Sequence, residues 1–327
     1  MKEEEIRPQK IFDEFLRLAR EDTKTYFSDA ERVSSNCPAC EEVGIPAFVK
    51  NGFTYETCPN CLSLYVNPRP AASVFSRYYT ESPSAEFWAK TFYKETADAR
   101  REKLWKPKAR LIHETLNLYN AGQYTLVDIG GGFGLFAEEM RSLCGQSPII
   151  IEPGPQLAEV CRKKSFTVIE KFLEQVVQED LPAGHKAFVC FELFEHLHDP
   201  SLFLKNLYSL MVPGDLFIFT TLSSSGVDIQ VLWDESKSVA PPHHLNFLNP
   251  HSIELLLGRI GYESIKVTTP GRLDIDILVN NHTAIKDRFW RTFISTASDS
   301  EKEDWQKVIT ASRYSSHMMV ICRKPLV

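Results

Sequence analysis

Residues 125–140, T-L-V-D-I-G-G-G-F-G-L-F-A-E-E-M, place four glycines between an apolar run and an amphipathic run. The run before the glycines predicts a buried strand, and the run after them predicts a helix. Glycines at such a turn let the backbone bend tightly and let a ligand approach the main chain closely. The helix then points its free N–H groups and the positive end of its dipole at that ligand. The stretch therefore predicts a ligand site, with a tight turn that binds nothing as the alternative.

The spacing of the glycines separates two kinds of adenosine-bearing ligand. A dinucleotide-binding turn needs glycines at positions 130, 132 and 135 here, but residue 135 is leucine. The pattern present is Asp128-x-Gly130-x-Gly132-x-Gly134. Glu152 ends the next apolar run, 22 residues after Gly130, where an acidic side chain can bind both ribose hydroxyls of an adenosine. The turn thus indicates an adenosine-bearing cofactor other than a dinucleotide.

From residue 123 onward, short apolar runs alternate with stretches of helical periodicity. The runs read TLVDI, PIIIE, FTVI, KAFVCF and DLFIFTTL, and we expect helices at 134–144, 155–164, 171–179, 200–211 and 250–260. This alternation predicts βαβ units and a parallel sheet, and so an α/β fold class. Two further runs near the C-terminus, YESIKVTT and SHMMVICRK, predict two more strands.

These features resemble the class I S-adenosylmethionine-dependent methyltransferases, whose first motif is an acidic residue followed by G-x-G-x-G. The segment F-E-L-F-E-H-L-H-D-P (191–200) is similar to the one after the fourth strand of that family. The segment L-M-V-P-G-D (210–215) is similar to its L-x-P-G-G but departs at the last glycine. The resemblance covers residues 123 to about 327. It implies a Rossmann-like, doubly wound seven-stranded sheet whose last strand is antiparallel.

The resemblance also implies S-adenosyl-L-methionine as cofactor and a set of residues that bind it. The set is Asp128, Gly130, Gly132, Gly134, Glu152, Phe172 and Glu192. Phe172 is expected to pack against the adenine, with a core phenylalanine as the open alternative. For Glu152 the alternative is an exposed carboxylate at a strand end, and for Asp128 it is a cap of the following turn.

Two C-x-x-C pairs stand closer to the N-terminus. Cys37-Pro-Ala-Cys40 and Cys58-Pro-Asn-Cys61 are separated by 17 residues, a spacing typical of zinc ribbons. Four thiolates leave no open coordination position, so we expect a structural Zn²⁺ that replaces the core a short module lacks. A redox pair is disfavoured, because neither C-x-x-C opens a helix in a βαβ unit. The other four cysteines are expected to be buried thiols, at Cys144, Cys161, Cys190 and Cys322.

Candidate catalytic residues follow the fourth and fifth strands, because the ligand crevice of an open α/β sheet lies beyond the carboxyl ends of its strands. His196 either lines the site or stabilises its turn by a hydrogen bond. Residues 241–247, P-P-H-H-L-N-F, hold His243 and His244. A histidine titrates near neutrality, so either could accept a proton from the methyl acceptor. Similar loops occur in methyltransferases of nucleotide-linked sugars, some of which carry a four-cysteine module; the alternative is packing or helix capping.

A basic, aromatic stretch precedes the first strand of the sheet. Residues 90–110 contain eight basic and three acidic side chains, and tryptophan, phenylalanine and tyrosine lie among them. Such a surface could clamp a phosphate or diphosphate and stack a base. The alternative is the solvated face of an amphipathic helix.

The chain divides into an N-terminal helix (1–35), a zinc-binding module (36–70), a helical connector or substrate lid (71–122) and the methyltransferase domain (123–327). The net charge of −6 gives no general attraction to nucleic acid or to an anionic membrane. No apolar run approaches a membrane span, and the first residues, MKEEEIRPQK, lack the apolar core of a signal peptide. We therefore expect a cytoplasmic protein.

Three functions fit these features. The first is methylation of a small molecule, which a nucleotide sugar would satisfy. The second is an RNA methyltransferase that grips its substrate with the zinc ribbon. It requires a basic ribbon, but residues 36–62 contain Lys50 alone against Glu41, Glu42 and Glu56. The third is a non-catalytic adaptor, which is disfavoured because the first motif is intact. The atom methylated and the oligomeric state stay open.

Overall fold

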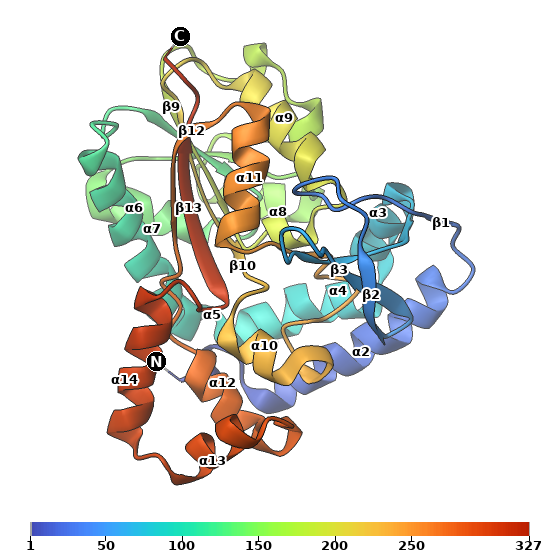
Figure 1. Cartoon of the computed structure of the whole chain (residues 1–327). Coiled ribbons are helices and arrows are strands. Elements are labelled where there is room, and N and C mark those ends of the chain that lie inside the picture. The colour runs from blue at the N-terminus through green and yellow to red at the C-terminus, as the bar shows by residue number, and fades with distance from the viewer. Residues whose placement is uncertain (1, 327) are drawn as a thin grey trace.

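The computed structural model describes residues 2–326, and its centre is a seven-stranded mixed sheet (Figure 1). The strand order is β12-β13-β10-β9-β6-β7-β8. In chain order these strands are β6 (Thr125–Ile129), β7 (Ile149–Ile151), β8 (Val168–Ile169), β9 (Lys186–Phe191), β10 (Leu216–Leu222), β12 (Glu263–Thr268) and β13 (His317–Arg323). Strand β13 is antiparallel to β10 and β12, and the other neighbours are parallel. The predicted fold class, including its antiparallel last strand, is confirmed.

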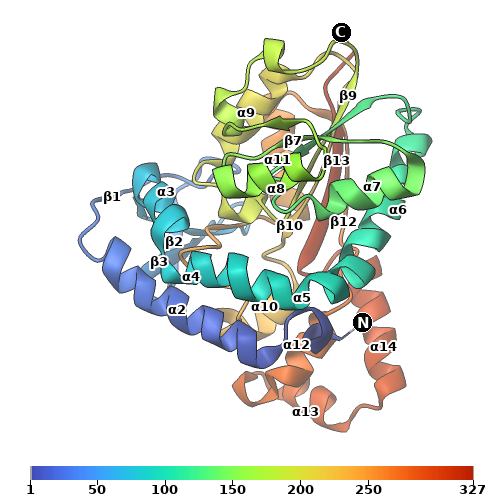
Figure 2. The ribbon, with the colours of Figure 1, turned by 180° about the vertical axis from the view of Figure 1, so that it is seen from behind.

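Helices cover both faces of this sheet because successive strand residues point to opposite sides. On one face, α6 (Lys106–Leu118) and α7 (Leu135–Cys144) pack on residues such as Leu126 and Val189. On the other face, α9 (Pro200–Leu210) and α11 (Pro250–Ile260) pack on their neighbours in the strands. Helix α8 (Pro155–Lys163) lies near β7 and β8 (Figure 2).

Four of the five helices predicted for this region are present, and the one expected at 171–179 is wrong. That segment forms two short 3₁₀ turns, Leu173–Gln175 and Gln178–Asp180. Between them Val176 and Val177 are extended, and Oδ2 of Asp180 accepts the Val177 N–H at 2.9 Å. Such a side-chain bond to the backbone competes with a continuous helix.

The N-terminal part joins the rest of the molecule through a second sheet. It has α1 (Glu3–Ile6) and α2 (Gln9–Phe27), which is shorter than the helix expected from the sequence. The strands that follow are β1 (Arg32–Val33), β2 (Ile45–Lys50), β3 (Phe53–Thr57), β4 (Leu64–Val66) and β5 (Arg69–Pro70). The second sheet has the order β11-β4-β3-β2, and its strand β11 (Asn246–Phe247) comes from far along the chain. The cysteine segment therefore shares a sheet with the histidine loop.

The connector begins with α3 (Ala72–Glu81), α4 (Pro83–Phe87) and α5 (Tyr93–Arg100), with π-helical turns at Trp88–Phe92 and Arg101–Trp105, and it ends with α6. Helix α2 packs against α4, and both run across the carboxyl ends of the central strands (Figures 1 and 2). These helices therefore cover the edge of the sheet where the ligand crevice was predicted.

A further group of helices lies at the same end of the molecule (Figure 1). It comprises α10 (Val227–Leu232), α12 (Asp274–Asn280), α13 (Arg288–Thr296) and α14 (Asp299–Ala311). Short 3₁₀ turns follow α10 at Trp233–Glu235 and α12 at His282–Ala284, and another follows β9 at Phe194–His196. Within residues 2–326, no helix combines the length and apolar character needed to cross a membrane.

Candidate active site

The glycine-rich turn joins β6 to α7 in a backbone conformation that favours glycine. The φ angles are 71° at Gly130, 55° at Gly132 and 72° at Gly134. A side chain at Gly130 would come within 2.8 Å of Leu193 Cδ2, whereas a Cβ at Gly132 would have nothing within 4 Å. The turn therefore depends on glycine and leaves open space beside Gly132.

Glu152 lies directly after β7 and faces this turn. Its Oε2 accepts a hydrogen bond from Gly132 N at 3.0 Å, and its Oε1 accepts one from Gly154 N at 2.9 Å. The side chain is not an exposed strand-end carboxylate, since it is 6% exposed and burial raises its pKa. Each oxygen keeps a lone pair for a further donor, as binding of ribose hydroxyls requires.

Asp128 is buried beneath the turn, and its Oδ2 has no hydrogen-bond partner among the described residues. It therefore does not cap the turn that follows it. Burial, and to a lesser degree the charge of Glu152, raise the pKa of Asp128 to about 7. The group lines a small cleft together with Tyr93, Trp105, Gly130, Gly131, Leu135, Phe136 and Phe191. An unpartnered carboxyl group in a cleft suits a cationic ligand group such as an amino acid ammonium.

Replacing Asp128 by Asn should stabilise the ligand-free protein at alkaline pH. Because the folded-state pKa is raised above the ordinary value, the stability penalty is absent below about pH 4 and grows as pH rises through about 7. The difference in unfolding free energy should reach up to about 4 kcal/mol near pH 8 and vanish near pH 4. Urea unfolding at both pH values measures it. A variant that is less stable than wild type near pH 8 would contradict this assignment.

Glu192 lies at the carboxyl end of β9 and is the centre of a charged network. Its Oε1 is 3.0 Å from Lys108 Nζ and 2.9 Å from His317 Nε2, and Thr220 Oγ1 donates to it at 2.9 Å. Burial opposes ionisation of Glu192, but the positive charges of Lys108 and His317 hold its pKa well below the ordinary value. Glu192 is therefore an anion next to the glycine-rich turn.

Two aromatic side chains, Phe172 and Tyr93, differ in their surroundings. Phe172 is 52% exposed, which excludes the alternative of a core phenylalanine and leaves its face free to pack against a planar ligand. Tyr93 of α5 stacks on Phe133 of the glycine-rich turn, with ring centroids 4.2 Å apart. The connector thus reaches directly over the turn.

The two loop histidines have different partners. His243 Nε2 lies 2.6 Å from the hydroxyl of Tyr78, whereas His244 Nδ1 lies 2.6 Å from the carbonyl oxygen of Ser238. Because a carbonyl oxygen only accepts, Nδ1 of His244 carries the proton and its Nε2 keeps a free lone pair in the neutral ring. Burial lowers the pKa of His243 to about 3 and that of His244 to about 4. Both rings are therefore neutral at physiological pH.

His196 lies beside the loop histidines. Its ring centroid is 4.8 Å from that of His244, and its Nδ1 is 3.4 Å from the hydroxyl of Tyr79. The neighbouring Glu195 is buried, and burial together with the charge of Glu192 raises the pKa of Glu195 to about 8. One donor atom from each of Glu195, His196 and His244 lies within 4.8 Å of the others. Such a group can pass a proton, and its donor set could also hold a divalent cation.

The four cysteines of the N-terminal part form one compact cluster of free thiols. Their sulfur atoms are 3.5 Å apart for Cys37 and Cys61, 3.4 Å for Cys40 and Cys58, and 3.5 Å for Cys40 and Cys61. Four sulfurs bound tetrahedrally at about 2.3 Å from zinc would be about 3.8 Å apart. The donor set therefore fits a tetrahedral Zn²⁺. Of the other cysteines, Cys161, Cys190 and Cys322 are buried as expected, but Cys144 is exposed at the end of α7.

The cysteine segment holds the histidine loop in place. The hydroxyl of Tyr55 donates to the carbonyl oxygen of His244 at 2.6 Å, and Val66 N donates to that of Leu245 at 2.9 Å. The side-chain amide of Asn249 donates to the carbonyl oxygen of Cys61 at 2.7 Å. The backbone of the loop is thus fixed on both sides of His244.

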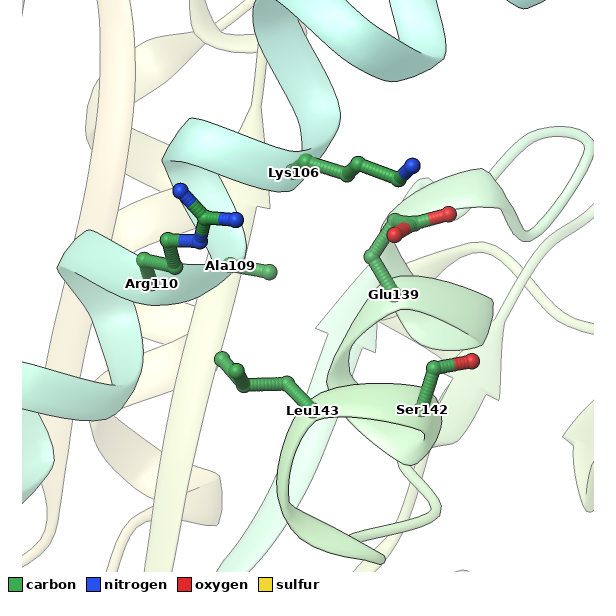
Figure 3. A pocket seen from close by; sticks show the side chains of 6 residues that line it. All are labelled: Lys106, Ala109, Arg110, Glu139, Ser142 and Leu143. Atoms are coloured by element: carbon green, nitrogen blue, oxygen red, sulfur yellow. The ribbon is translucent and has the colours of Figure 1, made fainter.

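Several residues of this site could not be assigned from the sequence. The connector is rich in aromatic residues, among them Tyr78, Tyr79 and Tyr93, but nothing in the sequence pattern places these three against the histidines or the glycine turn. No sequence motif marks His317 as a site residue, because it is simply the first residue of the last strand, β13. A separate groove between α6 and α7 contains none of the predicted cofactor, catalytic or metal residues, although Lys106 and Arg110 belong to the basic stretch 90–110 (Figure 3). It is lined by Lys106, Ala109, Arg110, Glu139, Ser142 and Leu143.

Comparison with known proteins agrees with this geometry. Residues 90–267, more than half of the chain, match the family described as "Methyltransferase domain". The matched region includes the glycine-rich turn and the histidine loop, and the four cysteines precede it. The ubiquinone biosynthesis O-methyltransferase of Xanthomonas euvesicatoria is 26% identical over 165 residues, which are 47% of this chain and 68% of the relative. That of Xanthomonas oryzae strain PXO99A is 31% identical over 121 residues, 35% and 49% of the two chains.

Solved methyltransferase structures are also similar. A methyltransferase from Archaeoglobus fulgidus is 16% identical with a TM-score of 0.43, over 66% of this chain and 94% of its own. The plantazolicin methyltransferase BpumL, solved with SAH, is 13% identical with a TM-score of 0.48, over 76% and 93% of the two chains.

The sheet with its antiparallel last strand, the glycine-rich turn and the acid after β7 define a class I S-adenosylmethionine-dependent methyltransferase. The chain belongs to the methyltransferase domain family that its residues 90–267 match.

Proposed function

We propose that this enzyme transfers a methyl group from S-adenosylmethionine to a hydroxyl group of a small molecule, with a nucleotide-linked sugar as the acceptor and His244 as the base. The observation that carries the proposal is the free lone pair on His244 Nε2, which the Ser238 carbonyl imposes through Nδ1. The relatives named above are O-methyltransferases, which supports an oxygen nucleophile. His243 and His196 would then shape the acceptor side of the crevice.

Residues around the glycine turn fit the methyl donor. S-Adenosylmethionine supplies a methyl group already activated on a sulfonium. The protein therefore needs to align the donor with the acceptor, to exclude water from the crevice and to deprotonate the acceptor hydroxyl. Glu152 would bind the ribose, Asp128 and Glu192 would face the cationic amino acid part, and Phe172 would cover the adenine. The glycines at 130, 132 and 134 would let the ligand lie against the main chain.

Replacing Glu152 by Ala should weaken S-adenosylmethionine binding by about tenfold to a hundredfold, because hydrogen bonds to a charged group contribute about 1.5–3 kcal/mol each. Isothermal titration calorimetry with S-adenosylmethionine measures the change. Glu159→Ala on α8 is the matched control, since the one ion pair that Glu159 makes within residues 2–326 is an exposed one with Lys163. Absence of saturable binding by the wild-type protein would remove the donor assignment altogether.

We also propose that the cysteine cluster holds a structural Zn²⁺ and serves the acceptor side of the enzyme, not RNA. Lys50, the only basic residue between positions 36 and 62, donates to the carbonyl oxygen of Ser236 at 2.8 Å and so is engaged inside the protein. Arg69, at the end of the module, is likewise engaged, since it donates to Asn246 Oδ1 at 2.6 Å. The module packs on the histidine loop through β4 and β11. Protection of RNA in a filter-binding assay at physiological salt would instead favour an RNA acceptor.

A further inference from the structure

Six of the eight basic residues between positions 90 and 110 fall into two groups. Four of them pair with acidic side chains on the outside of the molecule, and these are Lys90 with Glu86, Arg101 with Glu138 and Glu139, Lys103 with Glu5, and Lys106 with Glu102. They form the solvated face that was the alternative to a phosphate clamp. Two others, Arg100 and Lys108, point inward, and Lys108 is neutralised by Glu192.

Arg100 is a buried cation without an ion-pair partner among residues 2–326; the charge of Glu192 favours its charged form, but not through an ion pair. It ends α5 and is 9% exposed, and its Nε has no hydrogen-bond partner. Across residues 2–326 its guanidinium makes neither an ion pair nor a hydrogen bond; its contact is with the ring of Tyr93, 5.9 Å from Cζ to the centroid. A buried guanidinium is costly unless an anion and hydrogen-bond acceptors surround it. The missing partner is therefore an anion that enters the crevice.

Arg7 is a second cation that faces the same space. It follows α1, which packs against α5, and its Cζ lies 5.5 Å from the ring centroid of Phe12. It is half-buried and likewise has no ion pair within the described part of the chain. Burial is the main cause that lowers the pKa of Arg100, and the positive charge of Arg7 lowers it further. The charge of Arg7 also adds to the lowering of the pKa of His244 by burial. Arg7 therefore lies within electrostatic reach of both.

Packed aromatic rings connect Arg100 to the donor site and Arg7 to the histidine loop. Tyr93, which Arg100 contacts, stacks on Phe133 of the glycine-rich turn. Phe12, which Arg7 contacts, packs on Phe15, whose ring is 4.9 Å from that of His243. The two arginines are thus linked by packing to both halves of the candidate site, Arg100 to the glycine-rich turn and Arg7 to the histidine loop.

We propose that Arg7 and Arg100 bind the phosphate or diphosphate group of the methyl acceptor. The proposal rests on the proposed function, since it names the charged part of the molecule that His244 deprotonates. Two guanidinium groups can each bind a phosphate through paired N–H donors, so a diphosphate neutralises both. The buried position of Arg100 makes this binding depend on closure of the connector around the ligand.

The test uses inorganic pyrophosphate as the probe and the full-length, zinc-loaded protein. Isothermal titration calorimetry should show pyrophosphate binding to the wild type that weakens about tenfold or more in Arg100→Met and in Arg7→Met. Lys90→Met, which removes an exposed paired cation, should bind as the wild type does. Arg100→Met should unfold at the same or a higher temperature, since it removes an unpaired buried charge. Arg100→Lys keeps the positive charge but lacks the paired N–H donors of a guanidinium, so its affinity for pyrophosphate should be intermediate.

Two results would overturn the proposal. One is pyrophosphate binding that is absent in the wild type or unchanged in Arg100→Met. The other is an Arg100→Met variant that binds pyrophosphate normally but loses affinity for S-adenosylmethionine, because the anion would then be the carboxylate of the donor. His244→Ala should keep its pyrophosphate affinity, so a failure of the proposed base can be told apart from a failure of the anion site.

Discussion

Replacing Cys58 by Ser should abolish most of the methyltransferase activity while leaving the donor site able to bind S-adenosylmethionine. The reason is that the cysteine module fixes the backbone around His244, through Tyr55 on β3 and Val66 on β4. Loss of the metal would release these strands, and with them the loop. The glycine-rich turn and Glu152 follow strands β6 and β7 of the central sheet. None of the hydrogen bonds just named joins them to the cysteine cluster.

The stability of the variant should fall together with its activity. Structural zinc contributes about 10–16 kcal/mol to small domains that fold only with metal, and a module built into a larger core should lose part of that. A loss of about 5 kcal/mol would lower the unfolding temperature by about 10 °C or more. Elemental analysis should find about one zinc per chain in the wild type and well under one in the variant.

The exposed Cys144 provides the matched control. Cys144→Ser changes a thiol outside the cluster and should keep zinc content, unfolding temperature and turnover. A Cys58→Ser protein that lacks zinc but turns over like the wild type would show that the module does not position the loop. A wild-type protein purified without chelators that holds no zinc would remove the metal assignment itself.

The central sheet could be predicted from the sequence because its strands are buried on both faces. Such strands appear as continuous apolar runs, so KAFVCF and DLFIFTTL mark β9 and β10 directly. The prediction of a helix fails where a side-chain hydrogen bond to the backbone competes with hydrophobic periodicity. Residues 171–179 have helical spacing, but the Asp180 side chain closes a turn instead.

The part of the candidate site that is formed by residues close together in the sequence was predictable. The glycine turn and Glu152 lie within 23 residues of one another, and their spacing alone indicates the ligand. The other half depends on contacts between distant segments. Tyr78 and His243 are 165 residues apart, and Lys108 and Glu192 are 84 apart. Hydrophobic periodicity along the chain does not indicate which residues of distant segments come into contact.

The role of the cysteine module was equally hidden in the sequence. The C-x-x-C spacing predicts a metal site and a gain in stability, and nothing more. Its link to the histidine loop passes through β11, a strand of two residues at Asn246–Phe247 that pairs with β4. A two-residue strand is too short to show an alternating pattern.

Replacing His244 by Ala should lower kcat by about 10²–10⁴-fold, the usual contribution of a positioned general base. Calorimetry should show an unchanged affinity for S-adenosylmethionine, because the histidine loop does not contact Glu152 or the glycine turn through the hydrogen bonds described above. His243→Ala should have a smaller effect, since Nε2 of His243 is already engaged by the Tyr78 hydroxyl. Zinc should be about one per chain in the wild type and in both variants, and this equality would exclude a second zinc held by Glu195, His196 and His244.

The pH dependence of the wild type offers an independent measurement of the same base. His244 accepts a proton only when its ring is neutral, so activity should be present above its pKa and lost as pH falls through it. Because burial lowers that pKa to about 4, the plateau of kcat/KM should extend well below pH 6.5, the ordinary midpoint of a histidine. If His243 and His244 can each be replaced by Ala with near-normal turnover, the proton leaves by another route and the base assignment is wrong. An acid midpoint near 6.5 would instead show that the crevice is open to water when the acceptor binds, since burial is what lowers this pKa.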